Sequence, residues 1–186
     1  MIPERCRAII ARLANPEEAM LGATARLPLG ALLDDIAAPY RGEDLNIIVM
    51  ASDARMVEPG LPEPQVWRAP ELLHGLGNII ENAADFASSE VMIAASWNAE
   101  TLSVEIEDDG PGFAPEIYER IGEPYVTSRP GAEGSRTGHI GMGLGFFISK
   151  TLLERSGALV TFQNGRPHGA VVSARWPRSR IEVGEA

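Results

Sequence analysis

Apolar residues recur along this chain with two different periods, which predicts a mixture of helices and strands. A spacing of three to four residues predicts helices in four segments: 4–13, 29–37, 71–87 and 144–157. Short apolar runs and apolar–polar alternation predict five strands: 47–51, 91–97, 101–108, 158–164 and 169–176. Because adjacent strands are grouped and the helices lie between the groups, the predicted fold class is α+β. We expect a two-layer α/β sandwich in which about three helices back a mixed sheet, and not a doubly wound fold.

Prolines, glycines and small polar residues predict the connecting segments. Four prolines fall within 58–70, which predicts a loop with room for a short edge strand at 65–68. Residues 122–143 are rich in Gly, Pro, Ser and Thr, a composition typical of a long mobile loop. We expect one domain over 15–177, with a helical segment at 1–14 before it and a loose polar tail at 178–186 after it.

Composition and charge exclude several classes of protein. Of the 186 residues, 45% are hydrophobic and 23% are charged, which is ordinary for a globular domain. No apolar run reaches about 18 residues, so we expect no membrane segment, and the N-terminus lacks the apolar stretch of a signal peptide. The single cysteine, Cys6, rules out an internal disulfide and fits the cytoplasm. The net charge of −10, without basic runs, argues against nucleic-acid binding.

Two asparagines interrupt the apolar pattern of the helix predicted at 71–87. Asn78 and Asn82 are four residues apart, so their amides lie on the same side of the helix. Asparagine oxygens are suitable ligands for Mg²⁺, which takes few protein ligands and shares phosphate oxygens. On their own, two such residues more often belong to the solvent-facing side of an amphipathic helix.

The strand predicted at 101–108 ends in the segment Asp108-Asp109-Gly110-Pro111-Gly112. A carboxylate at the end of a buried strand can accept a hydrogen bond from an exocyclic amine, and glycines allow a flat ring to come close. A strand-ending turn, with aspartate side chains bonded to the local backbone, explains the segment at least as well.

A third segment, Gly141-Met142-Gly143-Leu144-Gly145, leads into the helix predicted at 144–157. Glycines before a helix N-terminus free the backbone amides to bind phosphate, and the helix dipole adds to this attraction. The segment matches neither of the common glycine patterns of nucleotide-binding proteins, so it is a weak indication when taken alone.

The order and spacing of these three segments resemble the N, G1 and G2 boxes of the Bergerat-type ATPase and kinase superfamily, which includes gyrase B, Hsp90, MutL and the histidine kinases. The resemblance covers residues 27–177. It implies an ATP-binding fold with a mobile lid and with ATP and Mg²⁺ as cofactors. It also implies that Asp108 reads adenine and that Asn82, with Asn78, holds the metal. The further nucleotide contacts that it implies are Gly110, Gly112, Gly141, Met142, Gly143, Leu144 and Gly145.

Within this superfamily, the details resemble the histidine kinases. The segment NIIENA at 78–83 is similar to the kinase N box, and IGEPYVTSR at 121–129 is similar to the F box, although Gly122 stands where many kinases have Phe. Together with GLGNIIENAADFA, these segments resemble the RegB/PrrB/ActS group of redox-responsive sensor kinases. The implied reaction transfers the γ-phosphoryl group of ATP to a histidine outside this chain, for relay to a response regulator. The F box adds three nucleotide contacts: Tyr125, Thr127 and Arg129.

An ATP hydrolase is the first alternative function. Hydrolysing members of the superfamily carry a glutamate four residues before the metal-binding asparagine, as a general base for water. This chain has Asn78 there, and an amide cannot take up a proton usefully at pH 7. Glu81 is the remaining nearby carboxylate, which either polarises an incoming histidine or faces solvent. Asn78, Glu81 and Asn82 are therefore the candidate catalytic residues.

A nucleotide-binding interaction module without catalysis is the second alternative. Asp85 stands where many kinases have a basic residue that contacts phosphate, and it remains a candidate contact at that position. Ala170 stands where many kinases have a threonine that is linked through water to the adenine-reading aspartate. The candidates to supply the missing positive charge are Arg129, Arg136 and Lys150.

No histidine of the chain has the setting of a phosphoacceptor: His74, His139 and His168 each fall outside a dimerisation hairpin. Residues 1–14 resemble the end of such a hairpin. The expected partners are therefore the phosphoacceptor hairpin of the parent kinase, in a homodimer, and a response regulator. The expected location is the cytoplasmic side of an inner-membrane sensor.

Cys6 is flanked by two arginines, whose charges favour the thiolate over the thiol. Its place before the ATP-binding domain is similar to that of a redox-sensing cysteine in RegB-type kinases. An ordinary helical cysteine packed against a hairpin is the alternative interpretation.

Overall fold

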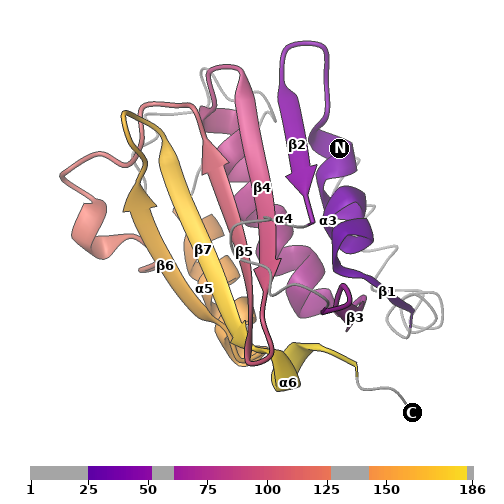
Figure 1. Cartoon of the computed structure of the whole chain (residues 1–186). Helices are drawn as coiled ribbons and strands as arrows, with labels where there is room; N and C mark the ends of the chain where they lie inside the picture. Colours follow the sequence, from indigo (N-terminus) through magenta and orange to yellow (C-terminus); the bar gives the residue numbers. More distant parts are fainter. Residues whose placement is uncertain (1–24, 52–60, 127–142, 184–186) are drawn as a thin grey trace, which may run out of the picture.

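The molecule has a sheet as one of its two layers. The computed structural model describes residues 25–51, 61–126 and 143–183. The strands of the sheet lie in the spatial order β2 (Asn46–Met50), β4 (Glu90–Trp97), β5 (Thr101–Asp108), β7 (Ala170–Pro177) and β6 (Leu159–Asn164) (Figure 1). β2 runs parallel to β4, whereas every other pair of neighbours is antiparallel. The sheet is therefore mixed, as the sequence predicts.

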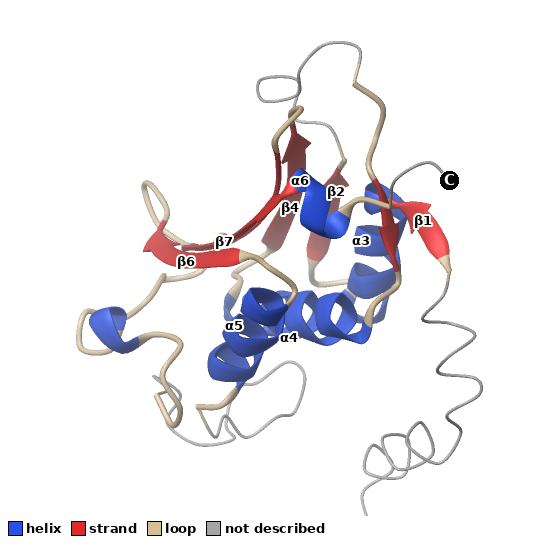
Figure 2. Ribbon diagram, turned by 90° about the horizontal axis from the view of Figure 1, so that it is seen from below, coloured by secondary structure: helices blue, strands red, loops and turns tan. Residues whose placement is uncertain are grey.

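Three helices form the second layer and cover one face of the sheet (Figure 2). They are α3 (Leu29–Ala37), α4 (Pro70–Phe86) and α5 (Gly145–Arg155). The predicted α+β two-layer sandwich is confirmed, and each of these helices lies within two residues of its predicted bounds. Within the described part of the chain, no helix combines the length and the apolar character needed to cross a bilayer.

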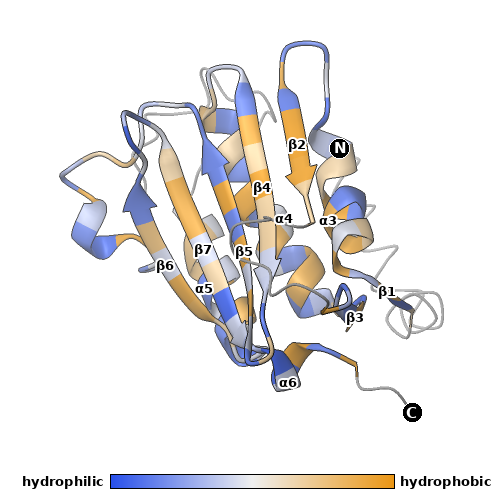
Figure 3. Ribbon diagram, in the orientation of Figure 1, coloured by the Kyte–Doolittle hydropathy of each residue, from blue (hydrophilic) through white to orange (hydrophobic). Residues whose placement is uncertain are grey.

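Alternation of side chains explains why the strands pack as they do. On β5, Leu102, Val104 and Ile106 are buried against the helices, whereas Ser103 and Glu105 lie on the outer face. Figure 3 shows the same contrast, with β2 and β4 mainly apolar and hydrophilic positions interspersed along β5. α4 buries the apolar side that its period predicts, with Leu72, Leu76, Ile79, Ile80 and Ala83 in the core.

Short elements account for most of the differences from the sequence prediction. β1 (Arg26–Pro28) pairs with β3 (Gln65–Trp67) in a separate two-stranded sheet, and the sequence predicts only the second of these strands. Two 3₁₀ turns, η1 (Ala38–Tyr40) and η2 (Tyr118–Arg120), were not predicted either. Elements of three residues are too short to show a period. The helix predicted at 4–13, and most of the loop predicted at 122–143, lie outside the described residues.

The prediction of a loose tail is wrong for residues 178–183. The chain forms α6 (Arg178–Ile181), a single helical turn at one end of the sheet. The Arg178 side chain is buried and forms a two-pronged ion pair with Glu182. Its guanidinium also donates to the backbone oxygens of Asn98 (3.1 Å) and Pro62 (3.3 Å). A charged pattern is typical of a solvated tail, and here the Glu182 carboxylate together with these two distant backbone oxygens makes the burial of Arg178 favourable.

α4 and α5 pack antiparallel and very close together. A Cβ atom added at Gly75, near the start of α4, would lie 2.7 Å from the Leu153 side chain near the end of α5. At the other end of the pair, a Cβ atom added at Gly145 would lie 3.1 Å from the side-chain nitrogen of Asn82. The two glycines thus allow the close approach that brings the start of α5 beside the asparagines of α4.

Candidate nucleotide-binding site

Asn78 and Asn82 lie half-buried on α4, one turn apart. The Asn82 side-chain nitrogen donates a hydrogen bond to the backbone oxygen of Asn78 at 2.7 Å. This bond uses the nitrogen of the Asn82 amide and leaves its oxygen available to a ligand. An oriented amide oxygen is suited to coordinate a hard cation such as Mg²⁺.

The start of α5 lies directly beside Asn82. Leu144 is the N-cap residue and Gly145 opens the helix. The amides of a first helical turn have no partner within their own helix, so they can bind an anion, and the helix dipole favours negative charge there. An amide oxygen for a cation and an N-terminal turn for an anion are therefore side by side. This pairing suits a metal-bound phosphate.

Gly143 joins this start of α5 to the segment that the F-box resemblance covers. Its φ angle is +70°, a conformation that disfavours residues with a side chain. An added Cβ would lie 2.6 Å from the carbonyl carbon of Tyr125 and 2.7 Å from the amide nitrogen of Val126. Tyr125 itself has a φ angle of +64° and is highly exposed. The backbones of the two predicted boxes are therefore in contact at this point.

Asp108 is buried at the end of β5, at the other half of the site. Its Oδ1 accepts hydrogen bonds from the backbone amides of Gly110 (2.9 Å) and Ala170 (3.3 Å). Burial raises the pKa of this carboxyl, and the two amide bonds partly oppose that rise. Because both amides bind Oδ1, Oδ2 is left to accept a hydrogen bond from the amine of a ligand.

The two halves of the site meet at Gly110. A Cβ atom added there would collide with the backbone oxygen of Phe86, the last residue of α4. The end of α4 thus abuts the segment that follows β5, and only glycine permits this approach. Gly112 lies further along, beside Asn164 and Gly169 of the β6–β7 hairpin.

Three groups of this region have no signal in the sequence. Asn164 exchanges two hydrogen bonds with the backbone of Phe113, at 2.6 Å and 3.1 Å, and so ties the segment after β5 to β6. Phe113, Phe146 and Phe162 form an edge-to-face cluster, with ring centroids 5.4 to 6.2 Å apart. The third group is the Asp109 carboxylate, which lies beside Asp108 in sequence but bonds to a different segment. Such contacts join residues far apart in the chain and follow no local period.

Three other predicted site residues lie within the described part of the chain: Glu81, Asp85 and Lys150. Glu81 is half-buried and accepts a hydrogen bond from the Tyr40 hydroxyl at 3.5 Å, so it does not simply face solvent. Asp85 lies in the last turn of α4. Lys150 packs against Gly122, and its ammonium lies 4.0 Å from Glu154, one turn later on α5.

Two of the three histidines, His74 and His168, lie within the described residues, and both are exposed. The remaining predicted residues lie outside the described part of the chain: Cys6, Thr127, Arg129, Arg136, His139, Gly141 and Met142. Their roles stay predictions.

Known proteins resemble this chain in sequence and in fold. Residues 68–180 match the family described as histidine kinase-, DNA gyrase B- and HSP90-like ATPase. The sensor histidine kinase RegB of Cereibacter sphaeroides is 38% identical over 193 residues, which cover 97% of this chain and 41% of RegB. The chain therefore spans about two fifths of the length of that relative.

Solved structures agree at the level of the fold. The mycobacterial sensor histidine kinase MprB superposes with a TM-score of 0.63 at 19% identity, over 83% of this chain and 97% of that one. Full-length ShkA in complex with AMPPNP superposes with a TM-score of 0.63 at 24% identity, over 88% of this chain and 32% of that one. The family match spans both halves of the site, from α4 through β5 to α5 and β7. This chain belongs to the histidine kinase-, DNA gyrase B- and HSP90-like ATPase family, and its nucleotide-binding catalytic domain is of the histidine-kinase type.

Proposed function

We propose that this domain binds Mg·ATP and transfers the γ-phosphoryl group to a histidine that lies outside this chain, for relay to a response regulator. The observation that carries the proposal is the arrangement of three groups around the contact between Gly110 and Phe86. Asp108 ends β5, Asn82 lies one turn before the end of α4, and Gly145 opens α5 beside Asn82. The contact between Gly110 and Phe86 fixes the first two relative to one another.

The adenine base would bind at Asp108. Its Oδ2 is the acceptor for the exocyclic amine, and the two backbone amides on Oδ1 hold the carboxyl in place. A buried acceptor discriminates strongly between ligands with and without a hydrogen-bond donor, because a ligand that lacks the amine leaves the acceptor unsatisfied. This chemistry favours adenine over a base that carries an oxygen at the same position.

The phosphates and the metal would bind between α4 and α5. Among the described residues there is no cluster of three His, Cys, Asp or Glu side chains, so no all-protein metal cage is present there. The amide oxygens of Asn82 and Asn78 are the ligands proposed, together with phosphate oxygens. Such sharing is typical of Mg²⁺, which keeps few protein ligands. When bound, the ion would neutralise charge on the transferring phosphate. The complex of the structural neighbour ShkA with AMPPNP supports nucleotide binding by this fold.

Phosphoryl transfer is favoured over hydrolysis by the residue at the position of the hydrolytic base. Asn78 occupies it, and an amide does not abstract a proton from water. Transfer to histidine needs positioning and charge neutralisation more than a strong base on the catalytic domain. In this step the bond between the γ-phosphorus and the bridging oxygen of ATP breaks, a bond to a histidine nitrogen forms, and ADP leaves.

The partners proposed for the parent protein follow from its relatives. The chain spans 41% of RegB, so a phosphoacceptor hairpin and a response regulator would act with residues beyond this domain. We propose the cytoplasmic side of the inner membrane as the location of the parent sensor. Cys6, with its two arginine neighbours, is the residue proposed to sense redox state in such a parent.

A phosphotransfer assay tests the proposal. The chain is mixed with labelled ATP, with and without Mg²⁺, in the presence of the phosphoacceptor hairpin of its parent protein. The expected product is an acid-labile, base-stable phosphoryl group on the hairpin, and none on the chain alone. Rapid phosphate release without the hairpin would identify a hydrolase instead. Tight nucleotide binding without either product would identify a non-catalytic module.

A further inference from the structure

Asp109 follows the proposed adenine-reading residue, but its side chain turns to a different part of the chain. Its Oδ1 accepts hydrogen bonds from the backbone amides of Ser88 (2.7 Å), Ser89 (3.0 Å) and Glu90 (3.1 Å). Its Oδ2 accepts from Ser89 twice, from the amide at 3.0 Å and from the hydroxyl at 2.7 Å. One carboxylate therefore gathers three successive residues of the segment that leads from α4 to β4.

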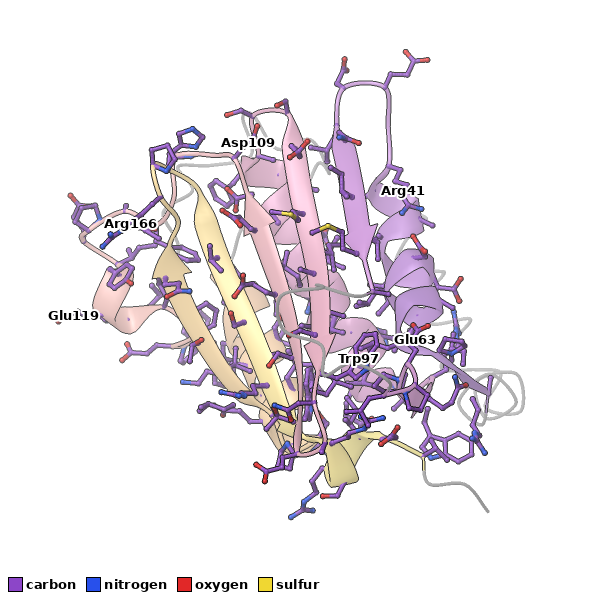
Figure 4. The ribbon with its side chains drawn as sticks, in the orientation of Figure 1. Arg41, Glu63, Trp97, Asp109, Glu119 and Arg166 are labelled. Atoms are coloured by element: carbon purple, nitrogen blue, oxygen red, sulfur yellow. The ribbon has the colours of Figure 1, made fainter. Side chains whose placement is uncertain are left out.

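We call the contact between Asp109 and residues 88–90 the joint, and backbone hydrogen bonds complete it. The Asp109 backbone oxygen accepts a hydrogen bond from the Ser88 hydroxyl at 3.1 Å, and its amide donates to the Glu90 oxygen at 3.2 Å. The Asn46 amide of β2 donates to the Ser89 oxygen at 2.9 Å, which fastens the same segment to the edge of the sheet. Asp109 lies at the end of the sheet remote from α6 (Figures 1 and 4).

The joint lies between the two halves of the nucleotide site. Asn82 precedes Phe86, the last residue of α4, by one helical turn, which is about 6 Å along the axis. On the other side, Asp108 is the residue directly before Asp109. A ligand that binds Asn82 through its phosphates and Asp108 through its base spans this joint. Its affinity therefore depends on the spacing that the joint sets, and displacements of about 1 Å are costly in such sites.

We propose that Asp109 is a positioning residue for nucleotide binding, because its carboxylate fixes residues 88–90 to the end of β5, which carries Asp108. Residues 88–90 follow α4, which carries Asn82, after a single intervening residue. The inference rests on the proposed function, since it assumes that one nucleotide bridges both residues. It assigns Asp109 no contact with the ligand.

The charge state of Asp109 suits this role. Burial alone would raise the pKa of its carboxyl, but the hydrogen bonds from Ser89, Glu90 and Ser88 outweigh burial and lower the pKa from 3.8 to about 2. The carboxylate is thus ionised at neutral pH, and charged acceptors form the stronger hydrogen bonds.

The test compares a ligand that spans the joint with a ligand that does not. Mg·ADP engages both halves of the site, whereas adenosine engages only the half at Asp108. Dissociation constants for both are measured by NMR titration of the full chain, well below the unfolding midpoint of each variant. In Asp109→Ala we expect Mg·ADP to bind about tenfold more weakly and adenosine to change less than about twofold. The Mg·ADP affinity of Asp109→Asn should lie between those of the unmodified chain and Asp109→Ala. The amide oxygen of the asparagine still accepts from Ser88 and Glu90, while its NH₂ faces the Ser89 amide.

Two further variants separate positioning from stability. Ser89→Ala removes a single hydrogen bond of the joint and should shift the ratio of the two affinities in the same direction, by a smaller factor. Glu182→Gln weakens the ion pair of Arg178 at the far end of the sheet. It should lower the unfolding midpoint and leave the ratio unchanged. If Asp109→Ala leaves the ratio as in the unmodified chain, or weakens both ligands equally, Asp109 has no positioning role. If the unmodified chain binds neither ligand, the proposed function itself is refuted.

Discussion

The two neighbouring aspartates at the end of β5 experience different environments, and their pKa values move in different directions. Burial raises the pKa of Asp108, whereas hydrogen bonds lower that of Asp109 to about 2. Asp108 is therefore less stable as an ion in the folded chain than in the unfolded chain, and Asp109 is more stable as one. This contrast leads to separate predictions for the two residues.

Replacement of Asp108 by Asn should strongly weaken nucleotide binding without unfolding the protein. The amide oxygen can still accept from Gly110 and Ala170, but an NH₂ group replaces the oxygen that faces the ligand amine. We expect the affinity for ADP to fall on the order of 100-fold. Because the folded-state pKa of Asp108 is raised, its ionisation lowers stability as the pH rises through that pKa. The Asn variant should thus be at least as stable as the unmodified chain at pH 7. Calorimetry and thermal unfolding measure both quantities, and unchanged ADP affinity would remove Asp108 from the site.

Asp109 should contribute to stability at neutral pH and lose that contribution in acid. Its folded-state pKa is lowered, so the contribution is present above its ordinary value of 3.8 and disappears as the pH falls through about 2. We expect the unfolding free energies of the unmodified chain and of Asp109→Asn to differ at pH 6 and to converge near pH 2. Urea unfolding across this range gives the comparison. A difference that stays constant with pH would show that the charge of Asp109 is not what stabilises the joint.

At the scale of the elements, the close contact between α4 and α5 sets the geometry of the half of the candidate site that we propose for phosphate. Gly75 faces Leu153 at one end of this contact, and Asn82 faces Gly145 at the other. An added methyl group would lie 2.7 Å from Leu153 at Gly75 but 3.1 Å from the Asn82 side chain at Gly145, so the packing is tightest at Gly75.

Gly75→Ala should therefore destabilise the domain although alanine is the better helix former. Propensity alone would favour alanine by about 1 kcal/mol, whereas the collision with Leu153 costs about 1–3 kcal/mol. Leu153→Ala makes space and should reduce the penalty of the alanine at 75, with a coupling of about 1 kcal/mol between the two sites. A double-mutant cycle from urea unfolding measures this coupling. Strictly additive effects would show that the two side chains do not compete for space.

The elements that the sequence predicts are those with a local signal. α4 shows an apolar period over four turns, and β5 shows alternation that ends at a glycine-rich turn. Both elements, and the places of Asn82 and Asp108 on them, therefore follow from the chain alone, whereas the roles of these two residues stay predictions. The joint at Asp109 could not be predicted, because its partners Ser88–Glu90 lie about 20 residues earlier and ordinary surface loops have the same composition. α6 was missed because burial of Arg178 depends on Pro62 and Asn98, which no pattern connects to it.

At the scale of the whole molecule, Arg178 links three segments at the end of the sheet that is remote from the candidate nucleotide site. Its guanidinium joins α6, the β4–β5 turn and the segment before β3. Its side chain is 9% exposed and that of Glu182 is 27% exposed, so water screens the pair only weakly.

Arg178→Ala should lower stability by about 3 kcal/mol, because it leaves the Glu182 carboxylate and two backbone oxygens without their donor. Arg120→Ala is the matched control. Arg120 pairs with Glu123 at 2.9 Å, but both side chains are more than half exposed, so its loss should cost less than about 1 kcal/mol. Neither variant should change ADP affinity while folded. Equal costs in chemical unfolding would show that burial of the Arg178 pair brings no extra stability.

The hydrogen bond from Ala170 to Asp108 spans 62 residues and has a consequence for synthesis on the ribosome. β5 lies in the sheet between β4, which precedes it in the chain, and β7, which is translated well after it. A nascent chain that has not yet reached residue 170 contains Asp108, yet lacks one of the two amides that orient its carboxyl and the strand that covers its flank. Such long-range pairings form late. We therefore expect the adenine half of the proposed site to be complete only after β7 has been synthesised and has paired with β5.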